Sequence, residues 1–352
     1  MKIAIINDTH FGVKQGNENF NNYVENFFSE LFFPYCKENQ IKTILHLGDF
    51  FDNRKFLNVK VLSFAEKIFL SKLKENNIHM YIILGNHDVY YKNTNTPNTL
   101  NLYLSKYENV TVIEEPQVLN FEDNYSIGMV PWITKENENK CMDFISSMPA
   151  PILAGHFECS GFSMMKNGPV ISEGLNTNIF KNYDQVLSGH FHTKSQHSNI
   201  FYLGTQYEIT WSDYNDQKFF HVIDTKNRTF TSVANTKTLF QKIYYDNGSN
   251  IDINEENISG KYIQVIVKNK ENLYNFDLFV DSLYKHSAFE VRIIETYDNY
   301  TDADISIDEM ITDTNELMKQ YVDSMSDVTL DKNRIKNMLD YLYIEAINSE
   351  EV

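Results

Sequence analysis

Five short apolar segments of this 352-residue chain end in the same way. Each is followed at once by a side chain that can bind a metal, and four of the five have a glycine directly before that side chain. The first three of these segments are separated by helix-length amphipathic stretches at 19–38 and 58–76. The pattern predicts a parallel or mixed α/β sheet with helices on its faces, whose strands deliver polar groups to one edge. The segments are KIAII before Asp8, KTILHL before Asp49, HMYIIL before Asn86, APILA before His156 and QVLS before His190.

The residues at these strand ends form a set of seven candidate metal ligands. His190 and His192 alternate along an extended segment, so both point to the same side. Carboxylates, an amide and imidazoles without a thiolate suit Mn, Fe or Zn in expanded coordination better than a structural zinc site. Seven ligands suffice for two ions if one carboxylate bridges, and paired ions about 3.5–4 Å apart are typical of phosphate ester hydrolysis. The set is Asp8, His10, Asp49, Asn86, His156, His190 and His192.

Composition and charge narrow the class of protein. A hydrophobic content of 42% is typical of a globular chain, and no apolar run approaches the roughly 18 residues that cross a bilayer. The N-terminal residues lack the features of a signal peptide, and the three scattered cysteines predict reduced thiols in a cytoplasmic protein. The net charge of −17 excludes a generally basic nucleic-acid binder, but residues 241–352 carry 10 basic and 23 acidic side chains, so the acid is concentrated there.

The sequence pattern also changes along the chain. Residues beyond 196 are rich in β-hairpin signals, such as the TKN turn within KFFHVIDTKNRTFTSV, and residues 261–295 predict a strand, a helix and a strand. We therefore expect a catalytic domain at 1–240, a small α+β domain at 241–297, an acidic linker at 298–306 and a helical segment at 307–352.

The last segment predicts two amphipathic helices, at 307–325 and 331–347. Two short helices on a tether cannot bury both apolar faces completely against each other, so we expect part of this surface to bind a partner protein. The candidate contacts are Leu317, Met318, Tyr321, Ile335, Leu339 and Leu342.

Taken together, the motifs resemble those of the calcineurin-like metallophosphoesterases. They are D-x-H from Asp8, G-D-x-x-D from Gly48, G-N-H-D from Gly85, G-H from Gly155 and G-H-x-H from Gly189. Within that superfamily the chain is similar to the nuclease subunit of SbcCD-type recombination complexes, most of all to the version encoded by large tailed phages. The resemblance implies a four-layer β-sandwich flanked by helices, a DNA-facing α+β capping domain and a C-terminal helical pair that docks on an SbcC-type coiled-coil ATPase.

The same resemblance implies an activity. It would depend on manganese, with magnesium as the alternative metal. The chain would hydrolyse phosphodiester bonds of double-stranded DNA ends and of single-stranded DNA, both as an endonuclease and as an exonuclease. The processes served would be recombination, repair and recombination-dependent replication in the host cytoplasm. The chain would act as a homodimer within a heterotetramer.

Roles for single residues also follow from the resemblance. Asp8, His10 and His192 would hold one ion, Asn86, His156 and His190 the other, and Asp49 would bridge them. His87 would stabilise or protonate the leaving 3′ oxygen, and Asp88 would orient His87. Some relatives have a histidine at the position of Asp52. In this chain Asp52 would orient a metal-binding histidine rather than touch the substrate. Gln206 replaces a common proline, which affects only a loop conformation.

Other residues and functions have two interpretations. Lys14, Arg54, Lys55 and Lys92 follow ligand-bearing strand ends, where they would contact DNA phosphates, or they are simply solvated. His46 and the Phe-rich run at 27–33 are expected in the core. A phosphoprotein or small-molecule phosphatase on the same fold stays open as an alternative, although Ser/Thr phosphatases usually have Glu after G-N-H. A non-catalytic scaffold is a second alternative, although every ligand is present.

Overall fold

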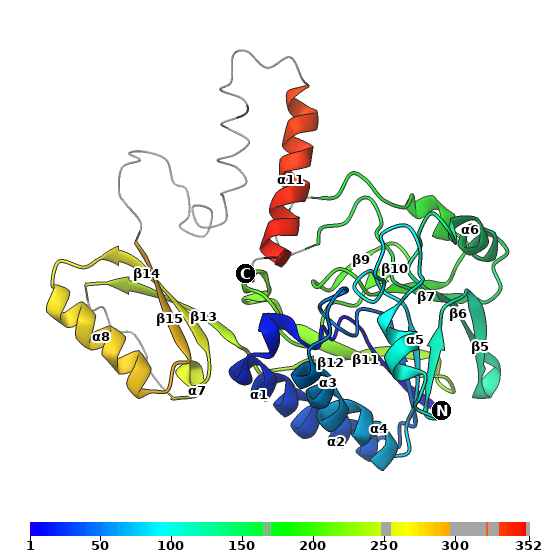
Figure 1. Ribbon diagram of the computed structural model, residues 1–352, viewed down its shortest axis with the longest axis horizontal. Coiled ribbons are helices and arrows are strands. Elements are labelled where there is room, and N and C mark those ends of the chain that lie inside the picture. The colour runs from blue at the N-terminus through cyan, green and yellow to red at the C-terminus, as the bar shows by residue number, and fades with distance from the viewer. Residues whose placement is uncertain are drawn as a thin grey trace.

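The ligand-bearing strands form two sheets rather than one. The computed structural model describes residues 1–164, 166, 168, 170–247, 255–295, 322 and 331–349. Within these, one six-stranded sheet has the order β12-β11-β1-β2-β3-β4 and another the order β5-β6-β7-β8-β10-β9 (Figure 1). The expectation of a single sheet edge was therefore wrong, because the strands before Asp8, Asp49 and Asn86 lie in the first sheet and those before His156 and His190 in the second.

The first sheet is parallel from β1 to β4, and β11 continues it antiparallel to β1. β11 and β12 form a hairpin around the TKN turn, as the sequence predicts. The strands are β1 (Lys2–Ile6), β2 (Thr43–His46), β3 (His79–Ile83), β4 (Val110–Ile113), β11 (Lys218–Asp224) and β12 (Thr229–Asn235).

The second sheet is parallel through β6, β7, β8 and β10, with antiparallel edge strands β5 and β9. One face of each sheet contributes to a shared core in which Ile5 and Leu45 of the first sheet join Met129 and Leu187 of the second. The strands are β5 (Gln117–Phe121), β6 (Tyr125–Val130), β7 (Ile152–Gly155), β8 (Gln185–Ser188), β9 (Ser195–His197) and β10 (Ile200–Tyr202).

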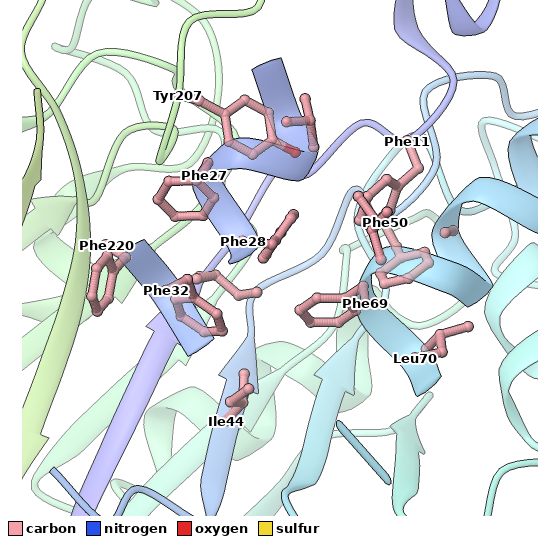
Figure 2. Close-up of a cluster of buried hydrophobic side chains, with 14 of the residues drawn as sticks. Phe11, Phe27, Phe28, Phe32, Ile44, Phe50, Phe69, Leu70, Tyr207 and Phe220 are labelled. Atoms are coloured by element: carbon pink, nitrogen blue, oxygen red, sulfur yellow. The ribbon is translucent and has the colours of Figure 1, made fainter. Parts of the chain in front are cut away.

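Helices cover the outer faces, which gives the four layers that we expected. Both long predicted helices contain a π-helical stretch, at Phe27–Phe32 and Glu66–Leu70. Phe27, Phe28 and Phe32 are at most 1% exposed in an aromatic core beneath the first sheet, so the Phe-rich run is confirmed as core (Figure 2). The helices are α1 (Glu18–Asn26), α2 (Phe33–Glu38), α3 (Val59–Ala65), α4 (Ser71–Glu75), α5 (Thr99–Leu104) and α6 (Glu138–Ser146). Short 3-10 turns lie at Val13–Gly16, Glu122–Asn124, Thr177–Phe180 and Trp211–Asp213.

A separate parallel sheet follows, which confirms the predicted strand, helix and strand of 261–295. Its order is β13-β14-β15, and α8 packs on it around Tyr245 and Phe276 (Figure 1). Asn19 in α1 donates a hydrogen bond to the carbonyl of Gly260, at 2.8 Å, and so links this sheet to the first helix layer. The elements are β13 (Phe240–Asp246), α7 (Glu255–Ile258), β14 (Tyr262–Asn269), α8 (Leu273–Lys285) and β15 (Glu290–Glu295).

Helix α11 (Lys332–Ser349) covers the second predicted C-terminal helix. Ile335 and Leu339 on it are half-buried, and Leu342 is exposed. The predicted linker at 298–306 and the first helix, with Leu317, Met318 and Tyr321, lie outside the described residues. None of the described helices is long and apolar enough to cross a membrane.

A buried lysine connects the two sheets next to the strand ends. Lys218, at the start of β11 and 3% exposed, lies 2.5 Å from an Asp213 oxygen and 2.9 Å from an Asp216 oxygen. The same ammonium group donates a hydrogen bond to the backbone carbonyl of His192, at 3.0 Å. The loop that carries His190 and His192 is thereby tied to the first sheet.

We expect Lys218→Met to lower the free energy of unfolding by about 3–5 kcal/mol, because the buried Asp213 and the half-buried Asp216 lose their cation. Urea unfolding followed by circular dichroism measures this. Lys67→Met is the matched control, since Lys67 pairs with Glu25 on the surface and should cost at most about 1 kcal/mol. Equal effects of the two substitutions would contradict the buried network.

A buried carboxyl group holds the chain where it enters β13. Glu208 is 1% exposed, and one of its oxygens accepts the backbone N–H groups of Leu239 and Phe240, at 2.5 and 3.0 Å. Burial raises the pKa of Glu208 to about 7, although these two hydrogen bonds oppose the shift.

This raised pKa predicts a pH dependence. The folded chain binds the Glu208 proton more tightly than the unfolded chain, whose carboxyl has a pKa near 4.5, so the contribution to stability is present below that value and is lost as the pH rises to about 7. The loss is roughly 3 kcal/mol. Glu208→Gln should therefore reduce the fall in melting temperature between pH 5 and pH 8. The exposed control Glu138→Gln should follow the unsubstituted chain, and an identical pH profile for Glu208→Gln would contradict the assignment.

Candidate metal centre

Two loops are held against each other where β1 and β2 end. The backbone N–H of Asp8 donates to the Gly48 carbonyl at 2.9 Å, and that of His10 to the Asp49 carbonyl at 3.1 Å. Asp8, His10 and Asp49 have positive φ angles of 48°, 43° and 55°. Non-glycine residues adopt this conformation at a cost that their surroundings must offset, and such residues cluster at functional sites. The two loops thus hold their side chains in strained but fixed positions.

The glycines before the ligands are required by close approach. A Cβ atom on Gly85 would lie 2.2 Å from an Asp49 carboxylate oxygen, and one on Gly48 would lie 2.7 Å from His156 Nδ1. Gly48 also has a φ of +91°, which favours glycine. Side chains at either position would push the ligand-bearing loops apart.

Asp8, His10 and His192 form one group. All three offer ligand atoms within 4.8 Å of one another. His10 Nε2 lies 3.8 Å from an Asp8 oxygen and 3.3 Å from His192 Nε2. On its other side His10 Nδ1 lies 3.2 Å from Asp52 Oδ1, so Asp52 is placed to orient the His10 ring.

Asp49, His156 and His190 form a second group. His156 Nε2 lies 2.9 Å from the side-chain oxygen of Asn86 and 3.4 Å from Asp49 Oδ2. His156 Nδ1 lies 2.7 Å from the Leu47 carbonyl, which can only accept, so Nδ1 carries a proton. The structure thus brings Asn86 together with the two histidines of the second sheet.

Asp49 lies between the two groups. Its Oδ2 atom is 3.7 Å from His10 Nε2 and 3.4 Å from His156 Nε2. The side chain of Asp49 is nearly inaccessible to solvent, at 3% exposure, and its other oxygen accepts the backbone N–H of His87, at 2.8 Å. One carboxylate oxygen therefore faces histidines from both sheets.

The electrostatics favour a cation at this point. Burial alone would lower the pKa of His10 and of His156, but nearby carboxylates raise both to about 9. Asp49 and Asp8 act on both histidines, and Asp52 acts on His10. Carboxylate oxygens thus lie next to buried imidazoles, and the buried His190 Nε2 atom has no hydrogen-bond partner among the described residues. This set of donor atoms fits two divalent ions. The residues present therefore suit the metals that the ligand pattern predicts.

His87 borders both groups. Its ring centroid is 4.8 Å from that of His10, and its Nδ1 lies 2.5 Å from the backbone carbonyl of Asp52. In this hydrogen bond Nδ1 is the donor, so Nε2 is the ring nitrogen that Asp52 does not bind. The neighbouring Asp52 thus positions His10 through its carboxylate and His87 through its carbonyl.

The structure corrects the expected role of Asp88. Its carboxylate does not contact His87 but accepts the backbone N–H groups of Asp49, Phe50 and Gly85, at 2.8, 3.0 and 2.8 Å. Asp88 therefore fixes the loop that carries Asp49 rather than the His87 ring. A sequence motif cannot distinguish these two functions, because two of the three amides, those of Asp49 and Phe50, come from another part of the chain.

Four basic residues were expected near DNA. Lys55 and Lys92 are exposed and Arg54 is half-buried, all in loops that follow ligand-bearing strands. Lys14 instead lies over the rings of Phe240 and Tyr262, at 5.8 and 5.5 Å, where the third sheet meets the first helix layer.

Outside the two groups, one further histidine has a structural role and one tryptophan lies against the ligands. His46 is fully buried and lies 3.1 Å from the Thr9 hydroxyl, as expected of a core residue. Trp132 was not among the predicted site residues, yet its ring lies 5.4 Å from that of His190 and 5.8 Å from that of His156. Its sequence signal is the V-P-W-I segment at 130–133, where β6 ends, whereas nothing in the sequence indicated the role of Lys218.

Comparison with known proteins agrees with this geometry. "Exonuclease subunit 1" of Enterobacteria phage T4 is 32% identical over 348 residues, which cover 98% of this chain and 99% of that protein. "DNA double-strand break repair protein Mre11" of Nanoarchaeum equitans is 25% identical over 252 residues, 64% of this chain and 66% of that protein. A solved archaeal phosphodiesterase matches at 12% identity with a TM-score of 0.34, over 66% of this chain and 99% of that one, a likeness too distant to bear on substrate or fold.

The family match covers the part of the chain that holds the site. Calcineurin-like phosphoesterases match residues 1–194, which include every residue of both ligand groups. The motif order, the two facing sheets and the near full-length similarity to the phage protein agree. The chain belongs to the calcineurin-like phosphoesterase family.

Proposed function

We propose that this chain is the two-metal DNA nuclease subunit of an SbcCD-like complex, with manganese as its metal. The observation that carries the proposal is the Asp49 Oδ2 atom, placed 3.7 Å from His10 Nε2 and 3.4 Å from His156 Nε2. A carboxylate in that position suits a bridge between two ions.

The residues of the two groups divide between the ions. Asp8, His10 and His192 would hold one ion and Asn86, His156 and His190 the other, with Asp49 placed to serve both. Bound there, two divalent ions would stabilise the charge that develops on the attacking and leaving oxygens of a phosphodiester. His87 acts on the substrate through Nε2, because Asp52 holds its Nδ1, and it stabilises or protonates the leaving 3′ oxygen.

The names of the relatives support DNA as the substrate. One relative is named as an exonuclease subunit and the other as a double-strand break repair protein. We infer that this chain processes DNA ends in recombination, repair and recombination-dependent replication, in the cytoplasm of its host and as a homodimer.

A release assay tests this proposal against a phosphatase. The purified chain is given linear duplex DNA, circular single-stranded DNA and a phosphopeptide, each with Mn²⁺ or Mg²⁺. We expect cleavage of both DNA substrates with Mn²⁺ and no phosphate from the peptide. Release of phosphate from the peptide without DNA cleavage would replace the nuclease by a phosphatase.

We expect Asp49→Ala and His87→Ala to fail in different ways. Asp49→Ala removes the group that faces both ligand sets and should bind much less manganese. His87→Ala keeps all seven ligands and should bind manganese normally but cleave DNA at least about 100-fold more slowly. Elemental analysis measures the metal per chain, and single-turnover assays measure cleavage.

His79→Ala is the matched control. His79 lies at the opposite end of β3 from Asn86 and contacts Thr111, so both metal content and cleavage should stay normal. Full metal in Asp49→Ala, or normal cleavage by His87→Ala, would contradict the assigned roles.

The C-terminal helix α11 is our proposed docking site for the SbcC-type ATPase. Met338, Tyr341 and Leu342 are 64%, 57% and 49% exposed on it, more than a helix that packs only on its own domain needs. The predicted contacts Leu317, Met318 and Tyr321 belong to the same proposal.

We expect Leu342→Asp to weaken binding of the ATPase roughly tenfold or more, because a charge enters an apolar contact. Cleavage of single-stranded DNA by the isolated chain should not change. Co-purification and calorimetry measure the binding, with the exposed Arg334→Ala as control. Unchanged affinity of Leu342→Asp would place the docking site elsewhere.

A further inference from the structure

Three exposed aromatic residues lie in the two loops that follow Asp52 and His87. Among the described residues of 1–247, only Phe56, Tyr90 and Tyr91 are exposed aromatic side chains, at 77%, 41% and 52%. The other Phe, Tyr and Trp rings among these described residues are buried or half-buried. Exposing large apolar rings forgoes the stabilisation that burial gives, so a cluster of them indicates a binding surface.

Both aromatic loops begin at residues of the site. Phe56 is the fourth residue after Asp52, which contacts His10, and Tyr90 is the third after His87. The Cα atom of each is therefore at most about 15 Å along the backbone from the Cα atom of that site residue. Neither aromatic segment can move far from the ligands without disturbing them.

Local hydrogen bonds fix the two loops. The side-chain oxygen of Asn53 accepts the backbone N–H groups of Lys55 and Phe56, both at 2.9 Å. The N–H of Tyr90 donates to the Pro97 carbonyl at 3.1 Å, and the rings of Tyr90 and Tyr91 meet edge to face with centroids 4.7 Å apart. The rings are thus presented to solvent from backbone that is already ordered.

Basic residues accompany the rings in both loops. Arg54 and Lys55 precede Phe56, and Lys92 follows Tyr91. Positive side chains that alternate with exposed rings suit a strand with anionic phosphates and flat bases. A partner protein with a purely apolar surface would not require basic side chains in these loops.

We propose that Phe56 and the Tyr90–Tyr91 pair are stacking surfaces for unpaired bases on either side of the scissile phosphate. The inference rests on the proposed nuclease function and names the form of DNA that the site accepts. Bases within a duplex are stacked on each other and present only their edges, so these rings require single-stranded or frayed nucleotides. The rings are specificity-determining residues and take no part in the chemical step.

The test compares ordinary and base-free strands. Fluorescein-labelled oligothymidylate and an abasic strand of equal length and charge are titrated with the full chain in Ca²⁺, and binding is read as anisotropy. Phe56→Ala and Tyr91→Ala should each weaken binding of oligothymidylate about fivefold or more. Neither should weaken binding of the abasic strand, which has no base to stack.

Three further variants and measurements make the result specific. Val59→Ala is the control, because Val59 is 78% exposed at the start of α3 but has no ring, and it should bind both strands normally. Phe56→Trp should restore the discrimination between the strands. Melting temperatures should be unchanged in all variants, since each side chain is exposed.

The outcomes separate this inference from the proposed function. If the unsubstituted chain cleaves DNA but Phe56→Ala and Tyr91→Ala bind both strands normally, stacking is wrong and the nuclease stands. Equal loss on both strands would also overturn stacking, as would loss of ATPase binding with normal DNA binding. If the unsubstituted chain cleaves no DNA and dephosphorylates the peptide, the proposed function itself fails.

Discussion

The hydrogen-bonded contact between the loops after β1 and β2 is the constraint on which the candidate site depends. Three backbone amides, those of Asp8, His10 and Phe11, donate across it to the 48–50 segment. Beneath it the rings of Phe11 and Phe50 lie 4.9 Å apart in the aromatic core. The core therefore fixes the backbone, and the backbone fixes the ligands despite their positive φ angles. A loop free to relax would lose this geometry.

Charge balance is the second constraint. The centre gathers buried carboxylates that repel one another unless positive charge is added, and their negative charge raises the pKa of His10 and of His156 to about 9. Next to it, Lys218 neutralises Asp213 and Asp216 while it holds the His192 carbonyl. Divalent ions in the centre and the lysine beside it would thus have the same effect, because both supply positive charge that offsets buried carboxylates.

Much of the site was predictable because strand ends are local features. Apolar runs followed by a polar group, in most cases after a glycine, identified residues from Asp8 to His192, and the structure brings them into two groups, with Asp49 of the second also close to His10 of the first. Asp88 was misassigned because its partners are backbone amides of residues 49, 50 and 85, and an amide has no sequence signature. Lys218 was missed for a related reason, since it connects the two sheets through the backbone carbonyl of His192, which also has no sequence signature.

The sequence by itself determined the strands, the helices, the aromatic core and the residue types available for chemistry, because these follow from the local pattern of apolar and polar side chains. The tertiary structure alone decided that the strands divide between two sheets, since strand pairing joins residues far apart in the chain. It also decided which ring nitrogen faces the site: the Leu47 carbonyl accepts a hydrogen bond from Nδ1–H of His156, and the Asp52 carbonyl accepts one from Nδ1–H of His87. Hydrogen bonds between distant segments set the orientation of each ligand, and only the folded chain brings those segments together.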